Sequence, residues 1–345
     1  MPANAFITGL AATALGAEER AFVRDADPWG LILFARNVQS PEQVRALVQS
    51  FRDAVGRADA PVLIDQEGGR VQRLGPPHWP KYPAGAAYGR LYDLDHALGL
   101  RAAFLGARLI ASDLEALGIT VDCVPLADMP VSGADNVIGD RAYGTMPGKV
   151  AALAGAVADG LTDGGVLPVL KHLPGHGRAA VDSHKALPVV TVDRETLAAT
   201  DFAAFRPLAG LPMGMTAHVV FAAIDPVAPA TTSVTIVRQV IRGTIGFDGL
   251  LMSDDLSMQA LAGTLGERAR ASLAAGCDVV LHCNGDLAEM TEVAASVPPL
   301  SGEAARRAGA ALAARRAPSA VDLAAARAEF SALLARQPAQ ASVSP

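Results

Sequence analysis

The sequence predicts an α/β fold of the (β/α)₈ (TIM) barrel type, formed by a single domain. Short apolar runs alternate with amphipathic helical segments along most of the chain, which is the pattern of βαβ units and of a parallel sheet. Eight such runs can be counted. Ionisable residues follow the ends of most of them, where a barrel of this type carries its functional groups.

The eight apolar runs are expected to form the strands of the barrel. They cover residues 5–10, 30–34, 61–65, 120–125, 167–171, 212–218, 250–253 and 278–282. The chain of 345 residues is long enough for a barrel, whose usual length is about 250 residues. A doubly wound open sheet is the alternative arrangement of the same units.

Amphipathic stretches between these runs are expected to form the surrounding helices. The clearest cover residues 17–24, 41–55, 95–117, 149–161, 233–242 and 265–275. Residues 301–335 are rich in Ala and Arg and predict two closing helices with a break at Pro318 and Ser319. We therefore expect one barrel domain over 1–335. Residues 336–345 lack periodicity, which predicts a disordered tail.

Composition limits the classes of protein and partner. Hydrophobic residues make up 51% of the chain, which is enough for a large core. The net charge of -6 argues against nucleic acid as the main partner and leaves a small neutral or anionic ligand. No run reaches the roughly 18 apolar residues that cross a membrane, and no basic residues precede the apolar N-terminal run as in a secretory signal. We expect a cytoplasmic monomer without a membrane partner.

The three cysteines, Cys123, Cys277 and Cys283, lie in or beside apolar segments and have no close paired spacing. Such a sparse, odd set argues against a disulfide framework and indicates a reducing compartment. We expect buried free thiols.

The densest group of ionisable residues follows the fifth apolar run. Residues 171–177 read Lys-His-Leu-Pro-Gly-His-Gly, and Asp182, Ser183 and His184 follow shortly after. A loop of small and ionisable residues buries little apolar surface, so stability alone does not explain it. In an extended segment, Asp182 and His184 project to the same side, where the carboxylate would prepare the imidazole for proton transfer. A solvated surface pair is the structural alternative.

A metal site in this stretch is not expected. His172 and His176 have the i, i+4 spacing of two metal ligands on a helix, but Pro174, Gly175 and Gly177 disfavour a helix there. No HExxH motif or cysteine set supports a metal either. The sequence predicts neither a metal nor a cofactor.

Two adjacent carboxylates, Asp254 and Asp255, directly follow the seventh apolar run. Adjacent side chains point in roughly opposite directions, so one can face a pocket while the other caps the next helix. We assign Asp254 to the pocket because it comes first after the strand. Capping or turn roles for both are the alternative.

Two further loops follow the third and fourth runs. Residues 65–73, from Asp65 to Arg73, combine two glycines with carboxylates and arginines, which suits a polyhydroxylated ligand. Their acidic side chains and the missing Walker pattern argue against a phosphate loop. Residues 136–144 contribute Asp140 and Arg141, which could also be an ordinary surface ion pair.

Taken together, these motifs resemble glycoside hydrolase family 3, and in particular its single-domain bacterial β-N-acetylglucosaminidases (β-hexosaminidases) of cell-wall recycling. The resemblance covers roughly residues 5–295. Residues 171–177 and 182–184 match the hexosaminidase hallmark, 253–258 the nucleophile motif, and 65–73 and 138–141 the sugar-binding loops. The family has a (β/α)₈ barrel, in agreement with the strand count.

The resemblance implies a retaining exo-enzyme that removes β-linked N-acetylglucosamine from 1,6-anhydro-N-acetylmuramoyl fragments. Asp254 would attack the anomeric carbon, and His184, supported by Asp182, would act as general acid and then base. The residues implied to hold the sugar are Asp65, Arg73, Arg141, Lys171 and His172. This chain has Leu173 where the family usually has phenylalanine, and residues 178–180 are less polar than is common there.

Three other functions stay open at this level. A phosphorylase of the same family would also suit a histidine acid/base, which repels an incoming phosphate less than a carboxylate does. Lys171, at a strand end, could form a Schiff base in a barrel aldolase. A non-catalytic sugar-binding barrel is the third alternative, and the intact nucleophile motif argues against it.

Overall fold

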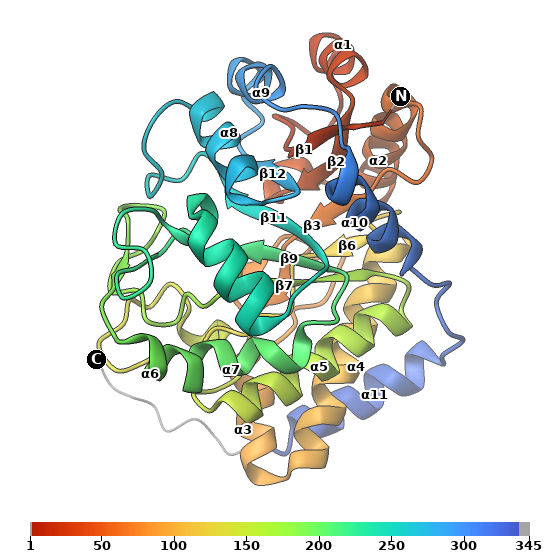
Figure 1. The fold of residues 1–345 in the computed structure, drawn as a ribbon. Coiled ribbons are helices and arrows are strands. Elements are labelled where there is room, and N and C mark those ends of the chain that lie inside the picture. The colour runs from red at the N-terminus through yellow and green to blue at the C-terminus, as the bar shows by residue number, and fades with distance from the viewer. Residues whose placement is uncertain (1, 338–345) are drawn as a thin grey trace.

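The computed structural model describes residues 2–337, which form a closed barrel of eight parallel strands surrounded by helices (Figure 1). The strands follow the order β1-β12-β11-β9-β7-β6-β3-β2 around the barrel. They are β1 (Asn4–Thr8), β2 (Pro28–Leu33), β3 (Val62–Ile64), β6 (Val121–Asp122), β7 (Leu167–Leu173), β9 (Met213–Thr216), β11 (Leu250–Asp255) and β12 (Val279–His282). Each expected strand is present, so the (β/α)₈ barrel is confirmed and the open sheet is excluded.

The strands place alternate side chains inside the barrel and under the helices. On β11, Leu250 and Met252 belong to the cluster that fills the barrel, whereas Leu251 packs with the outer layer. On β12, Val280 faces outward in the same way. Since both faces of a parallel sheet are covered, its strands are continuous apolar runs. This property made the strands recognisable in the sequence.

All six of the clearest predicted helices are present. They are α1 (Ala17–Ala26), α2 (Pro41–Val55), α4 (His96–Glu115), α5 (Pro147–Asp163), the π-helix η5 (Ile236–Ile245) and α8 (Leu265–Ala275). Helix α2 begins after Ser40, whose hydroxyl accepts the Gln43 N–H. Helix α8 begins with a capping box formed by Thr264 and Glu267.

Several shorter elements were missed. They are the helices α3 (Gly85–Leu94), α6 (Arg194–Ala199), α7 (Asp201–Phe205) and α9 (Leu287–Ala294), the hairpin of β4 (Gln66–Gly68) and β5 (Val71–Gln72), the pair of β8 (Val189–Val190) and β10 (Val220–Phe221), and the 3₁₀ turns η1 (Ala35–Asn37), η2 (Gly139–Arg141), η3 (Arg206–Leu208) and η4 (Ala230–Thr232). Helix α3 packs through Gly85 and Gly89, which approach the backbone of Arg141 and Tyr143. Because glycine makes these contacts, the sequence of α3 has no apolar periodicity from which the helix could be predicted.

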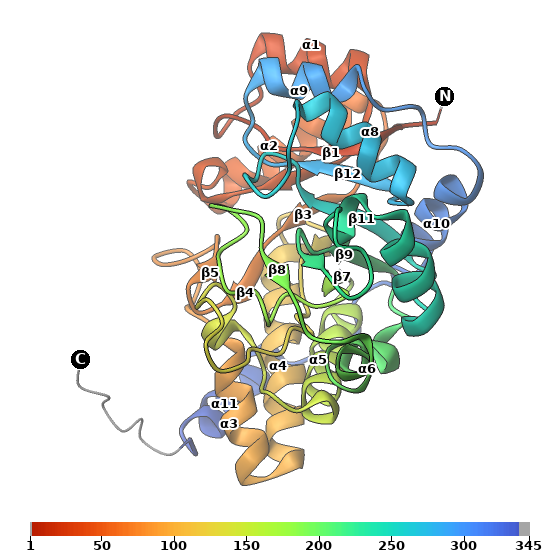
Figure 2. The ribbon, with the colours of Figure 1, turned by 60° about the vertical axis from the view of Figure 1, so that its left-hand side comes forward.

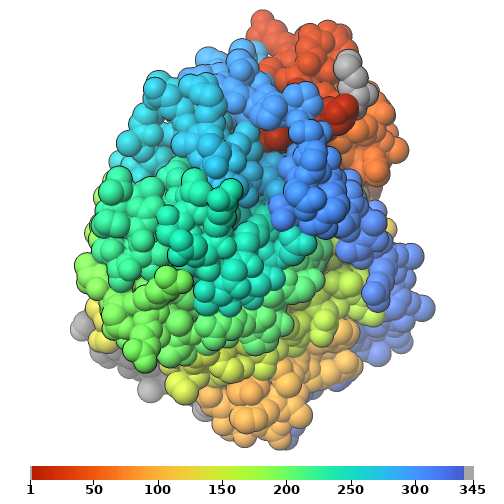
Figure 3. Space-filling view, viewed as in Figure 1, coloured from red at the N-terminus to blue at the C-terminus, as the bar shows by residue number. Residues whose placement is uncertain are grey.

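The C-terminal helices α10 (Gly302–Ala313) and α11 (Leu323–Leu334) agree with the prediction for residues 301–335. Helix α10 covers the base of the barrel, where the Leu300 N–H donates to the Ala3 carbonyl and Ala308 joins the interior cluster. Helix α11 packs on α4, and both C-terminal helices lie along one side of the molecule (Figure 3). The hairpin β4–β5 and strand β8 lie at the opposite end from α10 (Figure 2). From residue 338 onward, the expected tail at 336–345 lies outside the described residues. The disordered tail and the domain boundary at residue 335 therefore stay predictions.

Within residues 2–337, no helix is both long and apolar enough to cross a membrane. Cys123, Cys277 and Cys283 are buried and free. Burial raises the pKa of all three thiols, which keeps them protonated and unreactive at neutral pH.

Candidate active site

A pocket with a volume of about 170 Å³ lies at the C-terminal ends of the strands. Pockets for drug-sized ligands usually measure about 300–1,000 Å³, so this one suits a single small ring. The predicted site residues that line it are Asp65, Arg73, Arg141, Lys171, His172, His184 and Asp254. The remaining one, Asp182, contacts His184. The structure therefore brings all the predicted site residues to one place.

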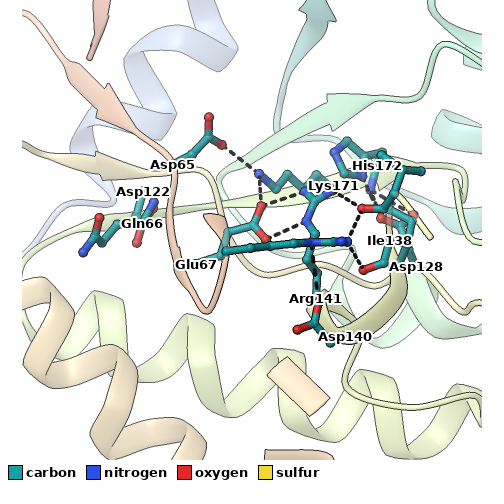
Figure 4. A network of polar contacts seen from close by, with 12 residues as sticks. Asp65, Gln66, Glu67, Asp122, Asp128, Ile138, Asp140, Arg141, Lys171 and His172 are labelled. Atoms are coloured by element: carbon teal, nitrogen blue, oxygen red, sulfur yellow. Dashed lines mark hydrogen bonds and ion pairs between the residues drawn. The ribbon is translucent and has the colours of Figure 1, made fainter. Parts of the chain in front are cut away.

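Lys171 joins two carboxylates at the floor of the pocket. Its Nζ lies 2.9 Å from Asp65 Oδ1 and 2.8 Å from Glu67 Oε1. Arg141 adds a bidentate pair with Glu67, in which both nitrogen–oxygen distances are 2.8 Å (Figure 4). Arg73 lies 3.3 Å from the second oxygen of Asp65. Buried charges arranged in this way hold each other in fixed positions.

The charges in this network stabilise one another's ionised forms. Burial alone would raise the pKa of Asp65 and Glu67, but the cations of Lys171 and Arg141, with Arg73 beside Asp65, hold both pKa values below their ordinary range. Burial likewise acts to lower the pKa of Lys171, and the two carboxylates raise it instead. A Schiff-base lysine needs a lowered pKa. The aldolase alternative is therefore disfavoured.

Asp128 is a fully buried carboxylate that holds two histidines. Its Oδ2 lies 2.6 Å from His172 Nδ1, and its Oδ1 accepts the backbone N–H of His176 at 2.6 Å. Burial acts to raise the pKa of Asp128, but charge on His172 and the hydrogen bonds lower it. A carboxylate at Nδ1 fixes the orientation of the His172 ring at the pocket.

Asp254 is the second-to-last residue of strand β11 and lines the pocket. Burial acts to raise its pKa, but charge on His172 and His218 and the N–H of Asp255 lower it. The side chain is thus a carboxylate at neutral pH, which is the form a nucleophile needs. Asp255 also lines the pocket, and its Oδ1 accepts the N–H groups of Ser257 and Cys283 at 3.1 Å.

The capping role considered for the second carboxylate does not apply. Helix α8 begins only at Leu265, and Thr264 is its N-cap. Asp255 instead stabilises the turn that follows β11.

Asp182 and His184 lie on the loop that follows β7. Asp182 Oδ1 lies 2.8 Å from His184 Nδ1 and accepts the His184 backbone N–H at 2.9 Å. The side chain of His184 is 65% exposed and that of Asp182 is 18% exposed. Burial acts to raise the pKa of Asp182, and the hydrogen bonds from His184 outweigh it and lower the pKa. The predicted contact between carboxylate and imidazole is present.

Sequence reasoning did not single out several residues of the site. Glu67 was included only within the loop of residues 65–73, Asp128 was given no role, and Phe34, His176 and Ser183 were not assigned to the pocket, which these last three residues line. The Phe34 ring lies beneath the guanidinium groups of Arg36 and Arg73, at 4.9 and 5.3 Å from its centroid. Position after a strand end was the available signal for Phe34 and Asp128.

The two histidines with helical spacing do not share a helix. His172 lies in β7, and His176 lies in the turn that follows. Among residues 2–337, no group of three or more His, Cys, Asp or Glu side chains is placed to hold a metal ion.

The family of the chain follows from its similarity to known proteins. Residues 7–310 match the glycosyl hydrolase family 3 N terminal domain. The chain belongs to glycosyl hydrolase family 3. It is therefore a glycoside hydrolase, and family membership agrees with the barrel and with the charged pocket at its mouth.

Relatives of this family 3 hydrolase include curated β-hexosaminidases. That of Alkalilimnicola ehrlichii is 44% identical over 80% of this chain and 79% of its own length, and that of Aromatoleum aromaticum is 37% identical over 82% and 80%. NagZ from Neisseria gonorrhoeae, crystallised with N-trifluoroacetyl-D-glucosamine, has a TM-score of 0.83 and 33% identity, with 97% of both chains covered. A family 3 β-N-acetylglucosaminidase from Paenibacillus has a TM-score of 0.78 and 32% identity, over 94% of this chain and 61% of its own.

Proposed function

We propose that this glycoside hydrolase is a retaining exo-β-N-acetylglucosaminidase. The observation that carries the proposal is that Asp254 and the pair of Asp182 and His184, from distant segments, meet at one pocket. Most retaining glycosidases use two carboxylates, one as nucleophile and one as acid and base. Here an imidazole supported by a carboxylate takes the second role.

The first half of the proposed reaction transfers the sugar to the enzyme. An oxygen of Asp254 attacks the anomeric carbon, and the bond from that carbon to the leaving oxygen breaks. His184 gives its proton to this oxygen, so the aglycone leaves as a neutral alcohol. Asp182 stabilises the charged imidazole before the transfer and orients it throughout.

The second half releases the sugar and restores the enzyme. Neutral His184 takes a proton from a water molecule, whose oxygen attacks the anomeric carbon and displaces Asp254. Two displacements at the same carbon give net retention of configuration. His184 is again protonated, and Asp254 is again a carboxylate.

The floor of the pocket would hold the sugar. Asp65 and Glu67 offer acceptors for hydroxyl groups, while Arg73, Arg141 and Lys171 offer charged donors, and the ring of His172 lies beside them. Their mutual ion pairs keep these groups in place before a ligand arrives. The relative NagZ, crystallised with an N-acylated glucosamine, supports a sugar of this kind in the pocket.

We further propose fragments that end in 1,6-anhydro-N-acetylmuramic acid as the natural substrates, as in cell-wall recycling. Such an aglycone is bulky and must extend out of the pocket on the side of the acid/base group. The 65% exposure of His184 leaves room on that side. Buried free cysteines agree with the reducing environment of the cytoplasm, where we expect the chain to act as a monomer.

The test compares p-nitrophenyl β-N-acetylglucosaminide with p-nitrophenyl β-glucoside at equal concentration. We expect clear preference for the N-acetylated substrate, and a preference for the plain glucoside would overturn the assignment. The same assay with added phosphate should give no sugar 1-phosphate and no acceleration, whereas both are expected from a phosphorylase. A purely sugar-binding barrel would release no p-nitrophenol.

A further inference from the structure

The segment that leads into the loop of Asp182 and His184 is fixed to the barrel. The backbone N–H of His176 donates to buried Asp128, which also holds His172. A Cβ at Gly177 would overlap the carbonyl of Met129, so the two backbones are in direct contact. His176 is thus part of the rigid floor, and its side chain is only 3% exposed.

The rest of the loop is held by few contacts near its functional end. Arg178 pairs with Asp201 at 2.7 Å, and the Ala179 carbonyl accepts the Asp135 N–H at 2.8 Å. Both contacts lie before the Asp182–His184 segment. A side chain that must transfer a proton gains from a supporting contact close to it, because loose positioning slows the reaction.

Ser183 supplies a contact at that place. It lies between Asp182 and His184 in sequence, yet it is only 2% exposed, whereas the side chains of these neighbours are 18% and 65% exposed. Its Oγ lies 3.0 Å from Nε2 of His176, and its carbonyl accepts the Ala260 N–H at 3.2 Å. Burial, with charge on His172, lowers the pKa of His176 to about 4. The ring is therefore neutral at working pH and needs no counter-ion in this buried place.

We propose that His176 and Ser183 form a hydrogen-bonded latch that positions His184 for proton transfer at the pocket. The latch connects the rigid floor, through Asp128 and His176, to the middle of the segment that carries the acid/base pair. Both are positioning residues, since they act through His184. The inference rests on the proposed role of His184 as general acid.

The test is the dependence of kcat/KM on the leaving group, because only poor leaving groups need a proton from His184. Phenyl and 2,4-dinitrophenyl β-N-acetylglucosaminide are compared for Ser183→Ala. Losing one hydrogen bond should lower kcat/KM about 5- to 10-fold for the phenyl glycoside and less than about 2-fold for the dinitrophenyl glycoside. Ser183→Thr, which keeps a hydroxyl, should restore most of the phenyl activity. Val181→Ala, a change at a 39% exposed position of the same loop, should alter neither substrate.

A double-mutant cycle tests whether His176 is the partner of Ser183. The phenyl-to-dinitrophenyl ratio of His176→Ala should fall as in Ser183→Ala, and the double variant should fall little further. Independent, multiplying losses would overturn the partnership. Because the ratio compares two substrates on the same sample, a partly unfolded preparation does not distort it.

His184→Ala serves as the reference. It should lose about 10²- to 10⁴-fold on the phenyl glycoside and far less on the dinitrophenyl one. If His184→Ala shows this dependence and Ser183→Ala affects both substrates equally, or neither, the latch alone is wrong. If His184→Ala itself shows no dependence on the leaving group, the general-acid assignment is wrong and the latch falls with it.

Discussion

At the scale of single residues, the groups proposed as nucleophile and as acid and base lie in different environments, one a buried carboxylate and the other an exposed imidazole. Asp254 is surrounded by positive and hydrogen-bonding groups that lower its pKa, which favours an ionised nucleophile. His184 is 65% exposed and contacts one carboxylate, so it can exchange protons with water and with a leaving group. The two environments suit the two different roles.

Asp254→Ala is expected to lower kcat/KM by about 10³-fold or more, because the proposed covalent step would lose its nucleophile. Binding of N-acetylglucosamine, measured by calorimetry, should change little, since the floor of the pocket is intact. Near-normal hydrolysis by this variant would contradict the assignment.

The lowered pKa of Asp254 makes a prediction about acidic conditions. The group stays ionised as pH falls from neutral through the ordinary aspartate value of 3.8, and it gains its proton only below that value. The part of kcat/KM that depends on this carboxylate should therefore be fully present at about pH 5 and be lost only at lower pH. A pH profile for the phenyl glycoside, measured where the fold is intact by circular dichroism, checks this. An acid limb centred above about pH 5 would argue against Asp254 as the group that must be ionised.

At the scale of elements, the groups proposed to bind the sugar are carried by short pieces that support one another. The hairpin β4–β5 brings Glu67 to Arg141, which lies on the turn η2, and helix α3 packs against that turn. Gln66 fixes the hairpin, since its side chain accepts the N–H groups of Arg73 and Leu74 at 2.9 Å. Positions in the pocket therefore depend on close contacts outside it.

Gly85→Ala tests this support from α3. A Cβ at Gly85 would overlap the carbonyl oxygen of Arg141. We expect the turn η2 to shift in response and to carry the guanidinium group of Arg141 away from Glu67. We expect KM for the aryl N-acetylglucosaminide to rise about 10-fold, with a smaller change in kcat. The control is Gly309→Ala in α10, where nothing lies within 4 Å of the new Cβ. That change should leave kinetics unaltered and stabilise the fold by about 0.5–1 kcal/mol, and equal KM values for the two variants would contradict the proposed support.

At the scale of the whole molecule, the barrel has a closed base and an open mouth. Helix α10 covers the base, and its Arg307 pairs with Asp248 at 2.7 Å and with buried Asp278 at 3.2 Å. Asp278 also accepts the Leu251 N–H, so this cluster of ion pairs connects helix α10 to strand β11. Stability at the base and chemistry at the mouth are thereby separated.

Arg307→Ala is expected to lower the free energy of unfolding by about 1–3 kcal/mol, since Asp278 keeps Arg242 but loses one partner. Urea denaturation measures the loss, and kcat/KM of the folded variant should stay close to that of the parent. Arg24→Ala, which removes a pair exposed by 64% and 68%, should leave stability essentially unchanged. Equal changes in the free energy of unfolding for the two variants would show that the ion pairs of Arg307 do not stabilise the fold.

The barrel and most residues of the candidate site could be predicted from the sequence. Strands buried on both faces must be apolar throughout, and functional groups of a barrel follow strand ends, so both left a local pattern in the chain. The tertiary structure alone decided that Glu67 joins Arg141 to Lys171, that Asp128 holds both His172 and His176, and that Ser183 turns inward to His176. These contacts join segments far apart or reverse the direction of a side chain within a loop. They depend on close approach and on compensation of buried charge, which no local periodicity records.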